Sequence, residues 1–144
     1  QMGNSNCRQR GILIVADHWE ALRPQWIRDA WIGIFEEYGV RLVHENHEHG
    51  YKRTVPIRGN KLDEERGVIY IGDGGWGAPI REAKKADDFW WLSEAKGAHH
   101  FFVAVLSADA KTLRVTPVFT GTKGGGTPLE LVARESRKLS PALP

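Results

Sequence analysis

The order of three segments near the start of the chain constrains its fold more than any other feature. The segment GILIVAD, residues 11–17, places four apolar residues behind a glycine, which is typical of a buried strand. Residues 24–38 predict a helix, with Pro24 in its first turn and Gly39 at its C-terminal cap. VRLVHE, residues 40–45, predicts a second strand. A strand, a helix and a strand in about 35 residues indicate a right-handed crossover between parallel strands.

The predicted helix has one apolar stripe that we expect to face a core. Its members recur at three- and four-residue spacing and are Ile27, Trp31, Ile34, Phe35 and Tyr38. Four further strands are predicted downstream, over residues 51–57, 67–73, 99–107 and 113–119, with turns at 58–60 and 108–110. Residues 81–95 predict a loop with a short helix, and residues 129–137 predict another short helix. The expected fold class is therefore α+β, with a mixed sheet in which one βαβ unit precedes antiparallel strands.

The length and charge of the chain limit its organisation and partners. With 144 residues, the chain suits one domain with one core, which we place at residues 11–120 between a loose lead-in (1–10) and a glycine-rich hinge with a tail (121–144). A formal charge of +2 predicts neither a nucleic-acid nor a membrane partner. No apolar run approaches the roughly 20 residues that span a bilayer, and the first residues contain no signal-peptide core. These features leave the localisation open.

A cluster of histidines and glutamates follows the second predicted strand, in the stretch VHENHEHGYKRT. If extended geometry continues there, His47 and His49 point to the same side. His18 follows the first predicted strand, and the carboxyl ends of neighbouring parallel strands lie together at the edge where ligands usually bind. Neutral imidazoles bind zinc and iron well, and three protein ligands with an open position are typical of a catalytic zinc site. The spacing therefore predicts a metal site formed by His18, His47 and His49; the alternative is a solvated polar loop.

Six tryptophans are many for a chain of this length. Most are expected to fill the core or cover its edge. Three of them lie in segments that are expected to be loop-like, and they could instead line a pocket for sugars or aromatic groups: Trp76, Trp90 and Trp91. The glycine-rich run from Gly72 to Gly77 is expected to let the backbone approach a neighbouring site.

Several segments together resemble the last part of the calcineurin-like metallophosphoesterases, which include the purple acid phosphatases. That family has a helix ending in Tyr-Gly-Val, a strand, and then Gly-His-x-His-x-Tyr-Glu-Arg-Thr; residues 46–54 read NHEHGYKRT here. The segment ILIVADHW is similar to the family's preceding strand, whose terminal histidine binds metal, and His18 takes that place. GVIYIGDGGWGAP and HHFFVAVLSADAKTLRVTPV resemble its later strands. The resemblance covers roughly residues 11 to 120.

The resemblance implies half of the family's four-layer sandwich and a metal-dependent hydrolase of small phosphoesters that is truncated relative to its family. It implies His18, His47 and His49 as ligands of zinc, iron or manganese and a role for His47 in catalysis. It also implies Arg53, or a backbone glycine amide, near the phosphoryl oxygens. The chain departs from the family at Asn46 and Lys52, which replace a glycine and a glutamate. The motifs of the family's N-terminal half do not occur in this sequence. A sheet face normally covered by that half would be buried by self-association, so a homo-oligomer is expected.

Two other functions remain open at this point. The chain could be a non-catalytic remnant that acts through assembly. It could also be a repurposed hydrolase that acts on another substrate class such as glycosides. Tryptophans would then bind the substrate, and a pair of carboxylates such as Asp73 with Asp87 or Asp88 would act as acid and base.

Overall fold

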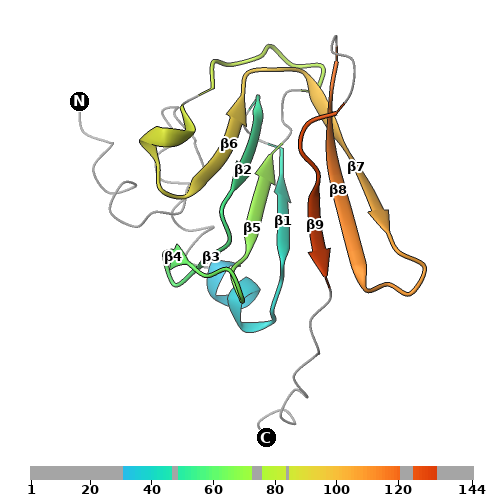
Figure 1. Ribbon diagram of the computed structural model, residues 1–144. Helices are drawn as coiled ribbons and strands as arrows, with labels where there is room; N and C mark the ends of the chain where they lie inside the picture. Colours follow the sequence, from blue (N-terminus) through green and yellow to red (C-terminus); the bar gives the residue numbers. More distant parts are fainter. Residues whose placement is uncertain (1–30, 47–48, 73–75, 84, 121–124, 133–144) are drawn as a thin grey trace, which may run out of the picture. The chain divides into compact units, whose positions relative to one another are not determined.

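The computed structural model describes residues 31–46, 49–72, 76–83, 85–120 and 125–132. The chain divides into two compact units, Gln1–Phe101 and Phe102–Pro144, each of which is described by itself. The described part is mostly β-structure with little helix, and its larger sheet is mixed (Figure 1). The expected first strand, residues 11–17, and its pairing with residues 40–45 lie outside the described residues. The predicted domain boundaries near residues 10 and 120 stay predictions.

The mixed sheet of the first unit has the strand order β1-β5-β2-β6 (Figure 1). Its strands are β1 (Leu42–Glu45), β2 (Tyr51–Thr54), β5 (Ile69–Gly72) and β6 (Leu92–Lys96). β5 runs parallel to β1 and antiparallel to β2, and β2 is antiparallel to β6. All four residues of β5 are buried, as expected of a strand with neighbours on both sides. The predicted strands at 40–45, 51–57 and 67–73 are confirmed in position, whereas β6 falls in a segment predicted as loop and helix.

The helix that precedes β1 is described over residues 31–37. It ends as its sequence predicts: Gly39 adopts φ +68°, and the Val40 amide donates to the Phe35 carbonyl at 2.9 Å. The predicted apolar stripe is wrong in detail, because Trp31, Ile34 and Tyr38 are 48%, 45% and 65% exposed. Ile32 packs instead against the core formed by buried residues of the first unit, namely Ile57, Trp91 and Leu92.

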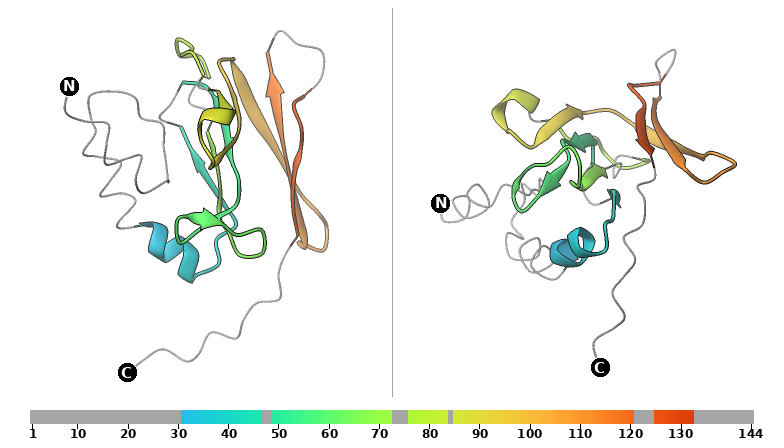
Figure 2. Two further views of the ribbon diagram at one scale, coloured as in Figure 1. Left: turned by 60° about the vertical axis from the view of Figure 1, so that its left-hand side comes forward. Right: turned by 60° about the horizontal axis from the view of Figure 1, so that its bottom comes forward.

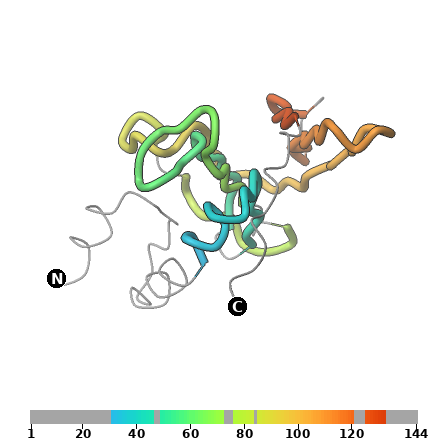
Figure 3. The backbone as a smooth tube through the Cα atoms, turned by 90° about the horizontal axis from the view of Figure 1, so that it is seen from below, coloured from blue at the N-terminus to red at the C-terminus, as the bar shows by residue number. Residues whose placement is uncertain are grey.

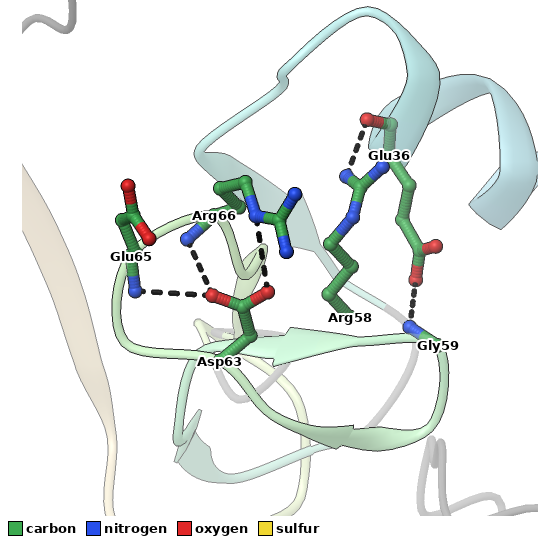
Figure 4. Close-up of polar contacts among 6 residues, drawn as sticks. All are labelled: Glu36, Arg58, Gly59, Asp63, Glu65 and Arg66. Atoms are coloured by element: carbon green, nitrogen blue, oxygen red, sulfur yellow. Dashed lines mark hydrogen bonds and ion pairs between the residues drawn. The ribbon is translucent and has the colours of Figure 1, made fainter.

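A small hairpin lies beside the helix (Figure 2). β3 (Ile57–Arg58) and β4 (Lys61–Leu62) are joined by Gly59 and Asn60, both at positive φ, in the turn predicted there. Arg58 Nη1 donates to the Glu36 carbonyl at 2.6 Å, and the Gly59 amide donates to Glu36 Oε1 at 2.8 Å (Figure 4). These bonds satisfy a carbonyl at the C-terminal end of the helix and attach the hairpin to it.

A second turn extends this cluster of polar contacts. Asp63 Oδ1 accepts hydrogen bonds from the amides of Glu65 and Arg66 at 3.1 and 2.7 Å (Figure 4). The Arg66 amide is the main reason that the pKa of the Asp63 carboxyl lies below its usual range. Asp63 therefore closes the turn that leads from β4 toward β5, in the manner of other turns built on an aspartate side chain.

The remaining strands form a sheet in the order β7-β8-β9, with β7 (His100–Leu106), β8 (Thr112–Phe119) and β9 (Leu129–Val132). The backbone reverses between β7 and β8 at the turn predicted for residues 108–110 (Figure 3). On β8 alternate residues are buried, namely Val115, Pro117 and Phe119. The short helix predicted for residues 129–137 is wrong where it is described, because Leu129 to Val132 pair antiparallel with residues 112–115.

Candidate functional site

The candidate site lies where two segments leave the same edge of the mixed sheet. Because β1 and β5 are parallel, both strands end at that edge (Figure 1). The chain that follows β1 and the chain that follows β5 meet there: the Arg81 amide donates to the His49 carbonyl at 3.0 Å, and His49 Nδ1 lies 3.0 Å from the Pro79 carbonyl oxygen. His49, a predicted ligand, is thus held at the edge where ligands of such sheets usually bind.

The contact with Pro79 determines the tautomer of the His49 ring. A carbonyl oxygen can only accept a hydrogen bond, so Nδ1 must carry the proton. In the neutral imidazole, Nε2 then presents its lone pair. Metal-binding histidines usually have this arrangement, in which the second ring nitrogen donates to a carbonyl or a carboxylate and fixes the orientation of the ring. His49 is therefore prepared to act as a ligand through Nε2.

The segment that holds His49 is tightly packed. A Cβ atom at Gly97, just after β6, would lie 2.7 Å from the Arg81 carbonyl oxygen. This distance is shorter than real Cβ atoms show, so only glycine permits the backbone of Arg81 to come so close. The chain around Pro79 and Arg81 is therefore held by its hydrogen bonds with His49 and by the close packing of the Arg81 carbonyl against Gly97.

The other two predicted ligands, His18 and His47, lie outside the described residues. Within the part of the chain that the structure describes, no group of three or more histidine, cysteine, aspartate or glutamate side chains is placed to hold a metal ion. The three-histidine site and the catalytic role of His47 therefore stay predictions.

Arg53, predicted near the phosphoryl oxygens, is part of a polar cluster on one face of the sheet. Its guanidinium Nη2 forms an ion pair with Glu94 Oε1, and the Tyr51 hydroxyl donates to Glu94 Oε2 at 2.6 Å. Burial, followed by the bond to Glu94, raises the pKa of Tyr51 above its ordinary value. Glu94 thus orients Arg53, whose role at phosphoryl oxygens stays a prediction. No motif in the sequence marks Glu94, which lies on the strand that was expected to be loop and helix.

Lys52 points to the opposite face and pairs with Glu45. Gly72 of β5 is the register partner of Glu45 on β1 and of Lys52 on β2, so the two charged residues lie on either side of it. The Lys52 side chain is 8% exposed and crosses over Gly72, where a Cβ atom would lie 2.5 Å from Lys52 Cε. This ion pair accounts for the lysine at a position where the resemblance leads one to expect a glutamate.

Two of the other three described histidines, His44 and His100, differ from His49 in their surroundings. His44 is exposed and pairs across β1 and β5 with Ile71. His100 is completely buried, with Nδ1 at 3.0 Å from the Ala98 carbonyl and Nε2 at 3.1 Å from the Gly72 carbonyl. Through the contacts of its ring nitrogens with these two backbone carbonyls, His100 connects the end of β5 with the start of β7.

The tryptophans separate into core and surface residues. Trp91 is buried in the core of the first unit. Trp76 and Trp90 are 63% and 50% exposed, and the ring of Trp76 makes an edge-to-face contact with Phe101 (centroids 5.4 Å apart, interplanar angle 83°). Of the carboxylates considered for a glycosidase, Asp87 and Asp88 are exposed in the short 3₁₀ helix η1 (Ala86–Asp88), and Asp73 lies outside the described residues.

Of three comparisons with known proteins, one bears on the fold. No family model matches the chain. Two uncharacterised proteins, from two strains of Mycobacterium tuberculosis, are each 33% identical to it in an alignment over 67 residues that covers 35% of this chain and 13% of theirs. A purple acid phosphatase from seeds of yellow lupin (Lupinus luteus) matches with a TM-score of 0.55 and 19% identity. That match covers 69% of this chain and 19% of the phosphatase.

The structural match shows a metallophosphoesterase-like fold over much of the chain, in agreement with the family that the sequence resembles. The chain spans less than a fifth of the length of each of these proteins. No described helix is both long and apolar enough to cross a membrane.

Proposed function

We propose that this chain is a metal-dependent hydrolase of phosphoesters, truncated relative to the family that it resembles. The observation that carries the proposal is the geometry of His49, whose Nδ1 proton is committed to the Pro79 carbonyl so that Nε2 is presented as a ligand. The similarity of fold to a purple acid phosphatase supports the same function. We further propose that the fold is an α+β half of a four-layer sandwich with one βαβ unit.

In the proposed site, His18, His47 and His49 hold zinc, iron or manganese. The chemistry that such an ion supplies when bound is polarisation of a phosphoryl oxygen and activation of water. The contributions of the protein are to fix the imidazoles and to place positive charge near the substrate. His49 is fixed by Pro79 and by the close approach at Gly97, and Arg53 is oriented by Glu94. The proposed substrate is a small phosphoester, and the proposed assembly is a homo-oligomer.

The test compares two histidines of the same segment. His49→Ala should lower the affinity for zinc or manganese at least about tenfold, the loss expected when one ligand or its supporting bond is removed. His44→Ala is the matched control, because His44 is exposed and lies on β1 only five residues earlier. Elemental analysis after dialysis, together with the rate of hydrolysis of 4-nitrophenyl phosphate, measures both effects.

The control variant should retain the metal content and the rate of the parent chain within a factor of two. His47→Ala should behave like His49→Ala, and a chelator should abolish activity in the parent. Equal metal content and equal rates in the parent, His49→Ala and His47→Ala proteins would refute the assignment of the site.

A non-catalytic, assembled form is the second candidate. One observation favours it: within the motif that resembles the metallophosphoesterases, Asn46 and Lys52 replace a glycine and a glutamate, and Lys52 is paired with Glu45. A parent chain that binds no metal and hydrolyses no phosphoester, yet sediments as a defined oligomer with or without a chelator, would support this candidate over the hydrolase.

A further inference from the structure

Trp76 combines a large aromatic ring with high exposure. It is 63% exposed, although tryptophan is among the most buried residues on average. Its ring is nevertheless supported, since it meets the ring of Phe101 edge to face at 5.4 Å. Such a contact orients the indole through part of its surface. Trp76 therefore stays largely accessible, in an arrangement set by Phe101.

Trp76 lies close in the chain to the residue that orients His49. It precedes Pro79 by three residues, so their Cα atoms are at most about 11 Å apart. Gly77, at φ +71°, turns the chain directly after Trp76, and the chain is then fixed at Pro79 and Arg81. Trp76 is thus carried by an anchored segment next to the proposed ligand His49.

We propose that Trp76, supported by Phe101, is a binding platform for the leaving group of the substrate, and that this leaving group contains a planar aromatic ring. The inference rests on the proposed function, because the phosphoryl end of the same molecule would lie at His49. An indole face stacks well on a planar ring and discriminates little among ring substituents. In the hydrolysis of such an ester, the bond between phosphorus and the aryl oxygen breaks, a water oxygen bonds to phosphorus, and the phenol takes the proton.

The test measures the preference for aromatic over aliphatic esters. The parent chain and Trp76→Ala are compared in kcat/KM for phenyl phosphate, glycerol phosphate and glucose 6-phosphate, with zinc or manganese added. Binding of phenylphosphonate and methylphosphonate, measured by calorimetry, gives a readout that needs no turnover. Trp76→Phe tests rescue by a smaller ring, and Trp90→Ala is the matched control because Trp90 is 50% exposed in a different segment.

Loss of the platform should weaken phenylphosphonate binding and phenyl phosphate turnover about fivefold, which corresponds to ~1 kcal/mol of ring stacking. The aliphatic ligands should change less than twofold, Trp76→Phe should recover most of the loss, and Trp90→Ala should match the parent. Equal losses for aromatic and aliphatic ligands, no aromatic preference in the parent, or a preference for glucose 6-phosphate would overturn the inference.

The two proposals fail in different ways. Turnover without an aromatic preference would leave the proposed hydrolase intact and remove the platform. Absence of turnover together with phenylphosphonate binding that depends on Trp76 would support the platform and contradict the hydrolase. Absence of both turnover and binding would overturn both.

Discussion

The ion pair between Lys52 and Glu45 predicts an unequal response to the loss of either partner. The Lys52 side chain is 8% exposed and the Glu45 side chain is 22% exposed, so the lysine is the more deeply buried member. Removing the carboxylate with Glu45→Gln leaves an ammonium group stranded in the protein. Removing the ammonium with Lys52→Met leaves a carboxylate that can still turn toward water. The less buried partner should therefore be the more costly one to replace.

The magnitudes follow from the burial of the group left behind. A stranded buried charge typically costs 3–5 kcal/mol, so Glu45→Gln should lower the free energy of unfolding by about 3 kcal/mol. Lys52→Met should cost about 1–2 kcal/mol, because Glu45 is partly hydrated. The double variant should be more stable than Glu45→Gln alone, since it no longer contains an unpaired ammonium.

Urea denaturation, followed by far-UV circular dichroism, measures these differences. With a slope of about 1.5 kcal/mol per molar urea, the midpoints of the two single variants should differ by roughly 1 M. Lys61→Met is the control, because Lys61 is exposed on β4 and should change stability by at most about 0.5 kcal/mol. If Lys52→Met is at least as destabilising as Glu45→Gln, or if the double variant is the least stable, the reasoning is wrong.

Two further predictions concern the same sheet. Gly72→Ala should destabilise the chain by about 1–3 kcal/mol in urea titrations, because the new methyl group would lie 2.5 Å from the Lys52 side chain. Gly33→Ala is the control: its new methyl group would meet nothing within 4 Å in the helix, so it should stabilise the chain by up to about 1 kcal/mol. Equal effects of the two substitutions would show that Lys52 does not crowd Gly72. Burial is the largest cause of the raised pKa of Tyr51 and of Tyr70, so the folded state keeps phenolic protons that the unfolded state loses at about pH 10. The stabilisation is complete below that pH and is lost above it, by up to about 1.4 kcal/mol per pH unit for each tyrosine. Tyr51→Phe or Tyr70→Phe should reduce this slope, and an unchanged slope in both would contradict the prediction.

Local signals predicted much of the first unit. The alternation and β-branched content of residues 40–45, 51–57 and 67–73 matched β1, β2 and β5, and Gly39 ended the helix as expected. The turn at residues 58–60 was predicted from its glycine and asparagine, and both of these residues adopt positive φ in the structure. These features depend on neighbours in sequence, which is why they could be recognised without a structure.

The errors occur where distant residues decide the conformation. Leu92–Lys96 and Leu129–Val132 have compositions that suit a helix, but each becomes a strand because a partner strand is available, β2 for the first and β8 for the second. The parallel pairing of β1 with β5 was not predicted, because β2, β3 and β4 lie between the two strands in the sequence. The expected pairing of β1 with residues 11–17 lies outside the described residues. A period-based analysis contains no information about such partners.

In the candidate site, too, local features were predicted, whereas contacts with residues distant in the sequence were not. His49 was predicted as a ligand from its spacing, but the carbonyl of Pro79 that orients its ring has no side-chain signature. Glu94, which binds both Tyr51 and Arg53, was not anticipated because it comes from a strand forty residues away whose existence depends on β2. His18 and His47 lie outside the described residues, so their part of the prediction is still to be tested by metal analysis.

The two ion pairs of β2 also have a consequence for strand alignment. Lys52 and Arg53 are consecutive residues of β2, a strand only four residues long. Lys52 pairs with Glu45 of β1 on one face of the sheet, and Arg53 pairs with Glu94 of β6 on the other face. A slip of one residue would exchange their faces, moving both cations away from their carboxylates and bringing a guanidinium toward Gly72. Misaligned forms of β2 would thus lose two ion pairs at once, so this short strand has a single favourable position between its neighbours.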